Sequence, residues 1–149
     1  MTEIGFYHLR ALPLERALPR LLEKALERGH RALVLAESSE RVAALDAALW
    51  TYDPASFLPH GTAAGPSPER QPILIAERPD NRNDADLLVL VGGIDVADLG
   101  AFARCLDLFD GNDDSAVAAA RERWQRRKAE GHALTYWQQS ETGQWQEKQ

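Results

Sequence analysis

The 149-residue sequence contains a single cysteine, Cys105. One cysteine excludes an internal disulfide, and it also excludes a zinc site built from several thiolates. The histidines lie in four separate segments, and no pair has the spacing of metal ligands: His8, His30, His60 and His132. Because Cys105 also lacks a neighbouring nucleophile signature, the sequence predicts neither a metal site nor a thiol enzyme.

Long hydrophobic runs are missing as well. The longest apolar run, residues 87–94, is far shorter than the roughly 20 residues that cross a bilayer. The first ten residues lack the basic leader and apolar stretch of a secretory signal. We therefore expect a cytoplasmic protein with no membrane partner. Residues 1–149 fit a single domain, in which residues 140–149 are a polar tail that frays unless Trp145 docks.

Phosphate-binding loops are also absent. The sequence has no GxxxxGK[ST] run, and the first strand-to-helix turn, residues 9–15, contains no glycine. The adjacent pair Gly92 and Gly93 indicates a tight turn rather than a phosphate cradle. Ser56 has no nucleophile signature, and His60 is better explained by a hydrogen bond that holds its loop. The sequence thus predicts no catalytic residues and no cofactor.

Strand-like and helix-like segments alternate along the chain. Apolar β-branched runs predict strands at 4–9, 31–37, 73–77, 86–92, 105–111 and 133–139. Helical spacing predicts helices at 12–29, 38–52, 95–104 and 113–130, with Ser38 as an N-cap. A proline-rich loop occupies residues 53–72. This alternation predicts an α/β fold with a mostly parallel central sheet, helices on both faces, and residues 34, 35, 74, 75 and 88–91 in the core.

Basic residues gather near the end of this acidic chain, whose formal net charge is −6. Residues 120–128 hold five of the 17 basic residues and one acid. On a helix, one stripe carries Arg121, Trp124, Gln125 and Lys128, and the adjoining side carries Arg123, Arg126 and Arg127. Two interpretations remain open. The cluster is a solvated face with its indole packed on the sheet, or it is a pocket in which arginines bind a carboxylate beside an apolar ring.

Three segments, in this order and spacing, carry a family resemblance: LDAALWTYDPASFLPHG (45–61), QPILIAE (71–77) and ARERWQRRKAEG (120–131). They resemble the chi subunit family of bacterial DNA polymerase III, and the likeness runs from FYHL near the start to LTYW near the end. The resemblance implies a Rossmann-like fold without a phosphate-binding loop. It also implies a non-catalytic adaptor of the clamp-loader assembly, which acts in DNA replication.

The resemblance further implies two binding surfaces. One binds the acidic, phenylalanine-ending C-terminal tail of single-stranded DNA-binding protein, through positions matched by Arg121 and Trp124. Gln125 replaces a family lysine, so that cation is either missing or supplied by Arg126 or Lys128. The other surface binds the psi subunit, or a helicase in its place, through positions matched by Trp50 and Phe57. Packing of the long loop on the sheet is the other explanation for these two aromatics.

Two classes of function follow. The adaptor binds the tail peptide without turnover and without tight nucleic-acid binding. The alternative is a nucleotide- or nucleic-acid-processing α/β enzyme, which would need a phosphate cradle or a catalytic set. The sequence contains neither, so the adaptor is favoured.

Overall fold

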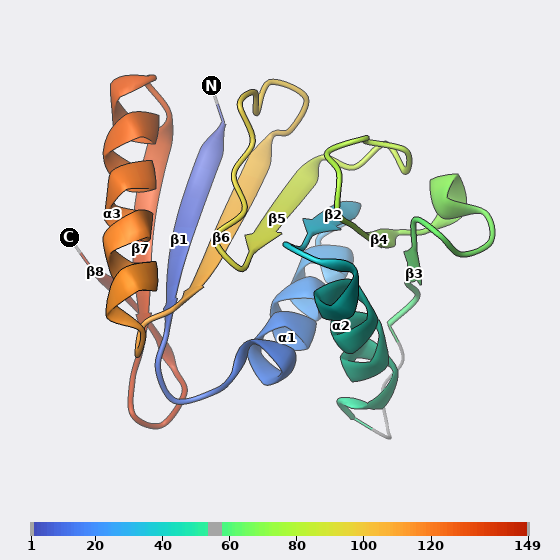
Figure 1. The fold of residues 1–149 in the computed structure, drawn as a ribbon, viewed down its shortest axis with the longest axis horizontal. Helices are drawn as coiled ribbons and strands as arrows, with labels where there is room; N and C mark the ends of the chain where they lie inside the picture. The colour runs from blue at the N-terminus through green and yellow to red at the C-terminus, as the bar shows by residue number, and fades with distance from the viewer. Residues whose placement is uncertain (1, 54–57, 149) are drawn as a thin grey trace.

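The computed structural model describes residues 2–53 and 58–148. In this part of the chain, eight strands form one sheet in the order β3-β4-β2-β5-β6-β1-β7-β8 (Figure 1). The strands are β1 (Glu3–Leu9), β2 (Ala32–Leu35), β3 (Gly61–Thr62), β4 (Ile73–Ala76), β5 (Leu87–Val91), β6 (Arg104–Asp110), β7 (Ala133–Gln139) and β8 (Trp145–Lys148). Every neighbouring pair is parallel except β7 with β8. The predicted α/β fold with a mostly parallel sheet is confirmed.

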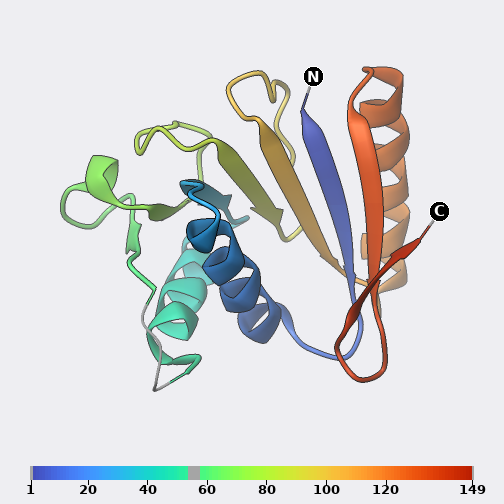
Figure 2. The ribbon, with the colours of Figure 1, turned by 180° about the vertical axis from the view of Figure 1, so that it is seen from behind.

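Helices cover both faces of the sheet. Helices α1 (Leu14–Glu27) and α2 (Ser39–Thr51) lie on one face, and α3 (Asp114–Ala129) lies on the other, behind the sheet in Figure 2. Leu18 of α1 and Leu45 of α2 share a buried cluster with Val34 of β2. Ala120 of α3 belongs to the cluster on the opposite face. Strands β1, β2, β4, β5 and β6 contribute side chains to both clusters, because alternate side chains of a strand point to opposite faces of the sheet.

The predicted core residues are all buried, and most of them are completely enclosed: 34, 35, 74, 75 and 88–91. Their strands are apolar on both faces because both faces are covered. The helix starts follow local sequence signals. Ser38 Oγ accepts a hydrogen bond from the Arg41 N–H at 3.1 Å. At α3, Asp113 Oδ1 accepts from the Ser115 N–H at 3.0 Å. These side chains satisfy donors that a helix N-terminus leaves unpaired.

The predicted helix at 95–104 is wrong. Residues 95–103 are irregular and lie over the α3 face of the sheet, where they bury Leu99 and Phe102, and Arg104 already begins β6. Asp98 Oδ1 accepts a hydrogen bond from the Gly100 N–H at 2.8 Å, which gives the backbone a local alternative to helical bonding. The apolar spacing that suggested a helix reflects burial of a loop.

The frayed tail expected at 140–149 also differs from the structure. After a turn in which the Ser140 N–H donates to the Gln144 carbonyl at 2.7 Å, residues 145–148 return as β8. Gly143 supplies the turn with its φ of 88°. Trp145 packs edge-on against Tyr7, with ring centroids 5.0 Å apart. Burial of this indole compensates for the polar composition of the segment.

Candidate interaction sites

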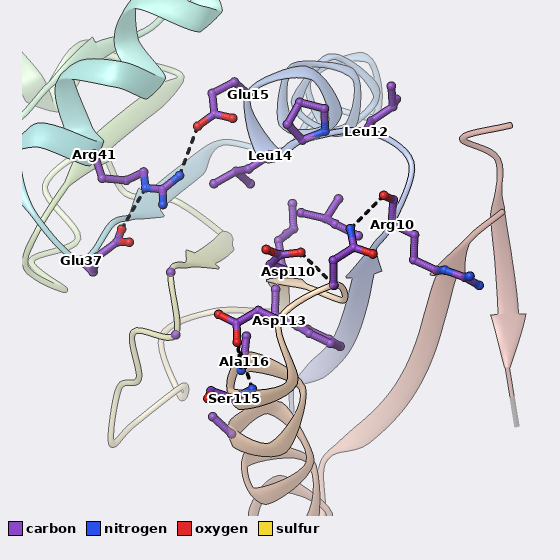
Figure 3. Close-up of a pocket in the computed structure, with 18 of the residues that line it drawn as sticks. Arg10, Leu12, Leu14, Glu15, Glu37, Arg41, Asp110, Asp113, Ser115 and Ala116 are labelled. Atoms are coloured by element: carbon purple, nitrogen blue, oxygen red, sulfur yellow. Dashed lines mark hydrogen bonds and ion pairs between the residues drawn. The ribbon is translucent and has the colours of Figure 1, made fainter. Parts of the chain in front are cut away.

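A pocket of about 710 Å³ opens at the carboxyl ends of the strands (Figure 3). Here β1 leads to a helix on one face and the neighbouring β6 leads to a helix on the other, which is where open α/β sheets bind ligands. Its lining contains four carboxylates, those of Glu15, Glu37, Asp110 and Asp113, and three arginines, Arg10, Arg41 and Arg123. Arg41 pairs with Glu15 at 3.2 Å and with Glu37 at 3.3 Å, and Arg123 pairs with Asp107. Most of the arginine charge at this pocket is therefore already engaged by the protein's own carboxylates.

Two sets of backbone donors at this edge are already used. Gln139 Oε1 accepts hydrogen bonds from three consecutive N–H groups after β1, those of Arg10, Ala11 and Leu12, each at 3.0 Å. A phosphate cradle would need such donors. Asp113 takes donors of the α3 N-terminus in the same way. A phosphate bound after β1 or at the start of α3 would therefore have to displace the chain's own side chains.

Two arginines of the basic cluster on α3 are internal. Arg123 donates to Asp107 on β6 from Nε at 2.7 Å and from Nη2 at 2.9 Å, and both side chains are buried. Burial lowers the pKa of Arg123, but the hydrogen bonds and charge of Asp107 outweigh this and raise it, so the guanidinium stays charged. Arg127 is also buried and donates to Asp95 at 3.1 Å and to the Val96 carbonyl. Arg123 and Arg127, which the helical spacing places beside the stripe of Arg121 and Lys128, therefore add no exposed charge to it.

The other cations of α3 are exposed. Arg126 pairs with Asp95, which partly neutralises it. Within residues 2–53 and 58–148, the side chains of Arg121 and Lys128 form no hydrogen bond or ion pair. Gln125 is exposed between them. The unpaired positive charge of the helix is therefore concentrated on Arg121 and Lys128.

Trp124 is half-buried beside these residues. Its ring meets Phe6 of β1 edge-on, with centroids 5.3 Å apart, and Tyr136 of β7 at 5.9 Å. The indole packs on the sheet, as one interpretation expects, but it is only partly buried and lies three residues from Arg121 on the helix, which the other interpretation requires. Packing holds the ring in one position, which would reduce the entropy lost when a ligand binds there.

Sequence reasoning missed two members of this surface, His8 and Tyr136. His8 Nδ1 lies 2.6 Å from the Tyr136 hydroxyl. Burial lowers the pKa of His8, and the charges of Arg10 and Arg121 lower it further, against a hydrogen bond to the Gly111 backbone. Burial raises the pKa of Tyr136, and Arg121 opposes the rise. Because side chains alternate along a strand, Phe6 and His8 were expected on the same face of β1, which was a signal for the position of His8. The α3 surface thus comprises Arg121, Trp124, Gln125, Lys128, His8 and Tyr136.

Trp50 lies on a different surface, on α2. Its side chain is 57% exposed, and its ring centroid is 4.8 Å from that of His60. His60 is buried, with Nδ1 2.6 Å from the Leu58 carbonyl and Nε2 3.2 Å from Asp46 Oδ1. The expected loop-holding role of His60 is confirmed. Phe57 lies outside the described residues.

Other reactive groups are few in the part of the chain that the structure describes. Burial raises the pKa of the Cys105 thiol far above its ordinary value, so the thiol is not activated as a nucleophile. Residues 2–53 and 58–148 contain no group of three or more His, Cys, Asp or Glu side chains arranged to hold a metal. None of the helices in these residues is long and apolar enough to cross a membrane.

Comparison with known proteins finds a family match that covers the sheet from β1 to β6, helix α3 and the start of β7. Residues 1–135 match the family model described as DNA polymerase III chi subunit, HolC. A Rickettsia prowazekii (strain Madrid E) protein named probable DNA polymerase III subunit chi is 32% identical over 97 residues. That alignment covers 65% of this chain and 59% of the Rickettsia protein. The chain thus spans less than two thirds of the length of this relative.

Proposed function

Because the chain belongs to the DNA polymerase III chi subunit family, we propose that it is a non-catalytic accessory subunit of the replicative clamp-loader assembly. In this proposal it acts in the cytoplasm and links single-stranded DNA-binding protein to the replisome. The linked segment is the acidic C-terminal tail that ends in phenylalanine. The paired arginines of the pocket and the occupied backbone donors after β1 and at the start of α3 disfavour the alternative of a nucleotide-processing enzyme.

One observation carries the tail-binding proposal: within the described residues Arg121 is an unpaired, exposed guanidinium three residues before the half-buried Trp124 on α3. A guanidinium can bind the terminal carboxylate through two parallel hydrogen bonds. The indole edge and the neighbouring Tyr136 ring then provide an apolar wall for the terminal phenylalanine. Arg121 and Trp124 are three residues apart on α3, so one terminal residue can contact both.

The remaining cations would act at longer range. Lys128 is exposed one turn beyond Trp124 and has no ion-pair partner among the described residues. Arg126 forms an ion pair with Asp95, which partly neutralises its charge. Gln125 adds no charge, so Lys128 is the candidate to replace the missing family lysine. Upstream acids of the tail would be attracted by this cation without close contact, because exposed charges interact weakly in water.

We assign the second partner surface to Trp50 and Phe57. Exposed large aromatics are frequent anchors of protein interfaces, and Trp50 rests on the buried, hydrogen-bonded His60. The occupant would be psi or a helicase that replaces it. Because α2 and α3 cover opposite faces of the sheet, both partners can bind at the same time.

Titration of the full-length protein with a fluorescent tail peptide tests the proposal. We expect saturable binding that disappears when the terminal phenylalanine is deleted, while a random single-stranded oligonucleotide binds weakly at physiological salt. A matched control, Arg78→Ala, removes an exposed cation outside α3 and should bind the peptide like the wild type. Magnesium-dependent, stoichiometric ATP binding, or stronger binding of the oligonucleotide than of the peptide, would contradict it.

The second surface needs its own test, in which Trp50→Ala and Phe57→Ala are compared for psi binding and for tail binding. We expect both variants to keep tail binding and to lose psi or its substitute. Loss of the fold in Phe57→Ala would assign that residue to the core rather than to an interface.

A further inference from the structure

A second aromatic and basic surface lies between the C-terminal half of α1 and strands β1, β6, β7 and β8, on the face seen in Figure 2. It is a pocket of about 230 Å³. Tyr7 stacks on Trp137, with centroids 6.2 Å apart and planes 13° from parallel, and Trp145 meets Tyr7 edge-on. Both tryptophans are half-buried. We name this site, lined by Tyr7, Lys24, Arg28, Arg104, Trp137 and Trp145, the Trp137 pocket.

The charge of the Trp137 pocket is positive. Its lining includes Lys24, Arg28 and Arg104, and no acidic residue lines it in the described part of the chain. The side chains of Lys24 and Arg28 form no hydrogen bond or ion pair with residues 2–53 or 58–148. Arg104 Nε forms a long ion pair with Glu3 at 3.8 Å and has no hydrogen-bond partner there. Lys24 and Arg28 are therefore available to a ligand, and Arg104 is held only by this long ion pair.

The cations stand close to the aromatic wall. Burial raises the pKa of Tyr7, and the positive charges of Arg104 and Arg28 oppose that rise, as expected for guanidiniums near the phenol. An anion that reached them would place its apolar part against the stacked rings. Positive charge and apolar surface are thus within reach of one small group.

This pocket is separate from the α3 surface. Tyr7 and Trp145 pack on the cluster that α1 and α2 cover, whereas Trp124 packs on the opposite one. The family model matches residues 1–135, so both tryptophans lie beyond the matched region. The pocket is therefore built from the shared sheet and a hairpin outside the family match.

The charge distribution selects the ligand. A nucleic-acid strand needs a basic track along several phosphates, but the cations here are confined to one small pocket of a protein with net charge −6. A short acidic peptide segment carries its negative charges over a short length, which matches cations that are confined to one small pocket. We propose that the Trp137 pocket binds an acidic peptide segment of a partner protein, whose apolar side chain lies on Tyr7, Trp137 and Trp145 while its carboxylates bind Lys24, Arg28 and Arg104.

The test uses the full-length protein and a fluorescent pentapeptide with one leucine between two pairs of aspartates and an amidated C-terminus. The amide removes the terminal carboxylate that the α3 surface is proposed to bind. We expect saturable binding by anisotropy, weakened about tenfold or more by the double substitution Lys24→Ala and Arg28→Ala. Both residues are exposed, so the fold should persist. Arg78→Ala and Arg121→Ala should bind the pentapeptide like the wild type.

Absence of binding to the wild type, or equal weakening by Arg78→Ala, overturns the proposal. So does equally tight binding of a matched peptide with asparagine in place of aspartate. Stronger binding of a ten-residue oligothymidine, lost in the Lys24 and Arg28 variant, would assign the pocket to nucleic acid instead. The pentapeptide experiment tests the Trp137 pocket separately from the α3 surface. If the tail peptide failed to bind, the α3 proposal would be contradicted, but the expected binding of the pentapeptide would not change.

Discussion

Arg123 on α3 and Asp107 on β6 form a buried, two-pronged ion pair, with Nε 2.7 Å from Oδ2 and Nη2 2.9 Å from Oδ1. The pair joins the helix to the centre of the sheet at a fixed rotation. That rotation turns Arg123 and Arg127 inward and leaves Arg121, Gln125 and Lys128 exposed. The polar contact under α3 thus determines which cations form the α3 surface.

Arg123→Ala should lower the free energy of unfolding by about 3–5 kcal/mol, because it leaves Asp107 buried without its partner. Urea denaturation followed by circular dichroism measures this. Arg121→Ala, on the same helix but exposed, should change stability by less than about 0.5 kcal/mol. Equal stability of the two variants would show that the buried pair does not hold the helix.

Arg121→Ala should weaken binding of the tail peptide roughly 30- to 1,000-fold, as for a central charge pair at an interface. Lys128→Ala should weaken it less than about fivefold, and most of that effect should vanish at high salt. Calorimetric titration at two salt concentrations separates the two residues. Equally mild effects would mean that the α3 surface attracts polyanions in general.

Gly111→Ala should disturb His8, because an added Cβ would stand 1.8 Å from His8 Cδ2. We expect a loss of about 1–3 kcal/mol in the free energy of unfolding, the usual cost of overpacking. Binding of the tail peptide should weaken as well, since His8 lies against Tyr136. Gly65→Ala is the control, because its Cβ would meet its nearest neighbour at an ordinary 3.4 Å. A Gly111 variant that matches this control would contradict the crowding around His8.

The pKa of His8 is lower in the folded protein than the ordinary histidine value of about 6.5, which applies to the unfolded chain. The free energy of unfolding should therefore decrease as pH is lowered from about 6.5 towards the pKa of folded His8. In this window the unfolded chain binds a proton that the folded chain does not, so unfolding becomes more favourable as pH falls. His8→Gln should reduce this slope, measured by urea denaturation at closely spaced pH values. All other titrating groups are common to both proteins, so an unchanged slope would assign the effect elsewhere.

The strands and most helices could be predicted from the sequence because their signals are local. Apolar runs bounded by polar turns located β2, β4 and β5, and Ser38 marked the start of α2. The failures occurred where a distant contact outweighed local preference. Residues 95–104 have helical spacing but pack as a loop over the sheet, and the polar tail becomes β8 when Trp145 packs against Tyr7.

The site shows the same division. The sequence by itself determined that α3 is a helix with five cations around an indole, and that phosphate loops are missing. Only the tertiary structure decided that Arg123 and Arg127 are internal, since Asp107 and Asp95 come from other segments. It also brought His8 and Tyr136 beneath Trp124 and built a cationic aromatic pocket from α1, β1, β6 and the final hairpin. Helical spacing shows which residues share a face, whereas the partners that orient that face are distant in sequence and are brought to it by folding.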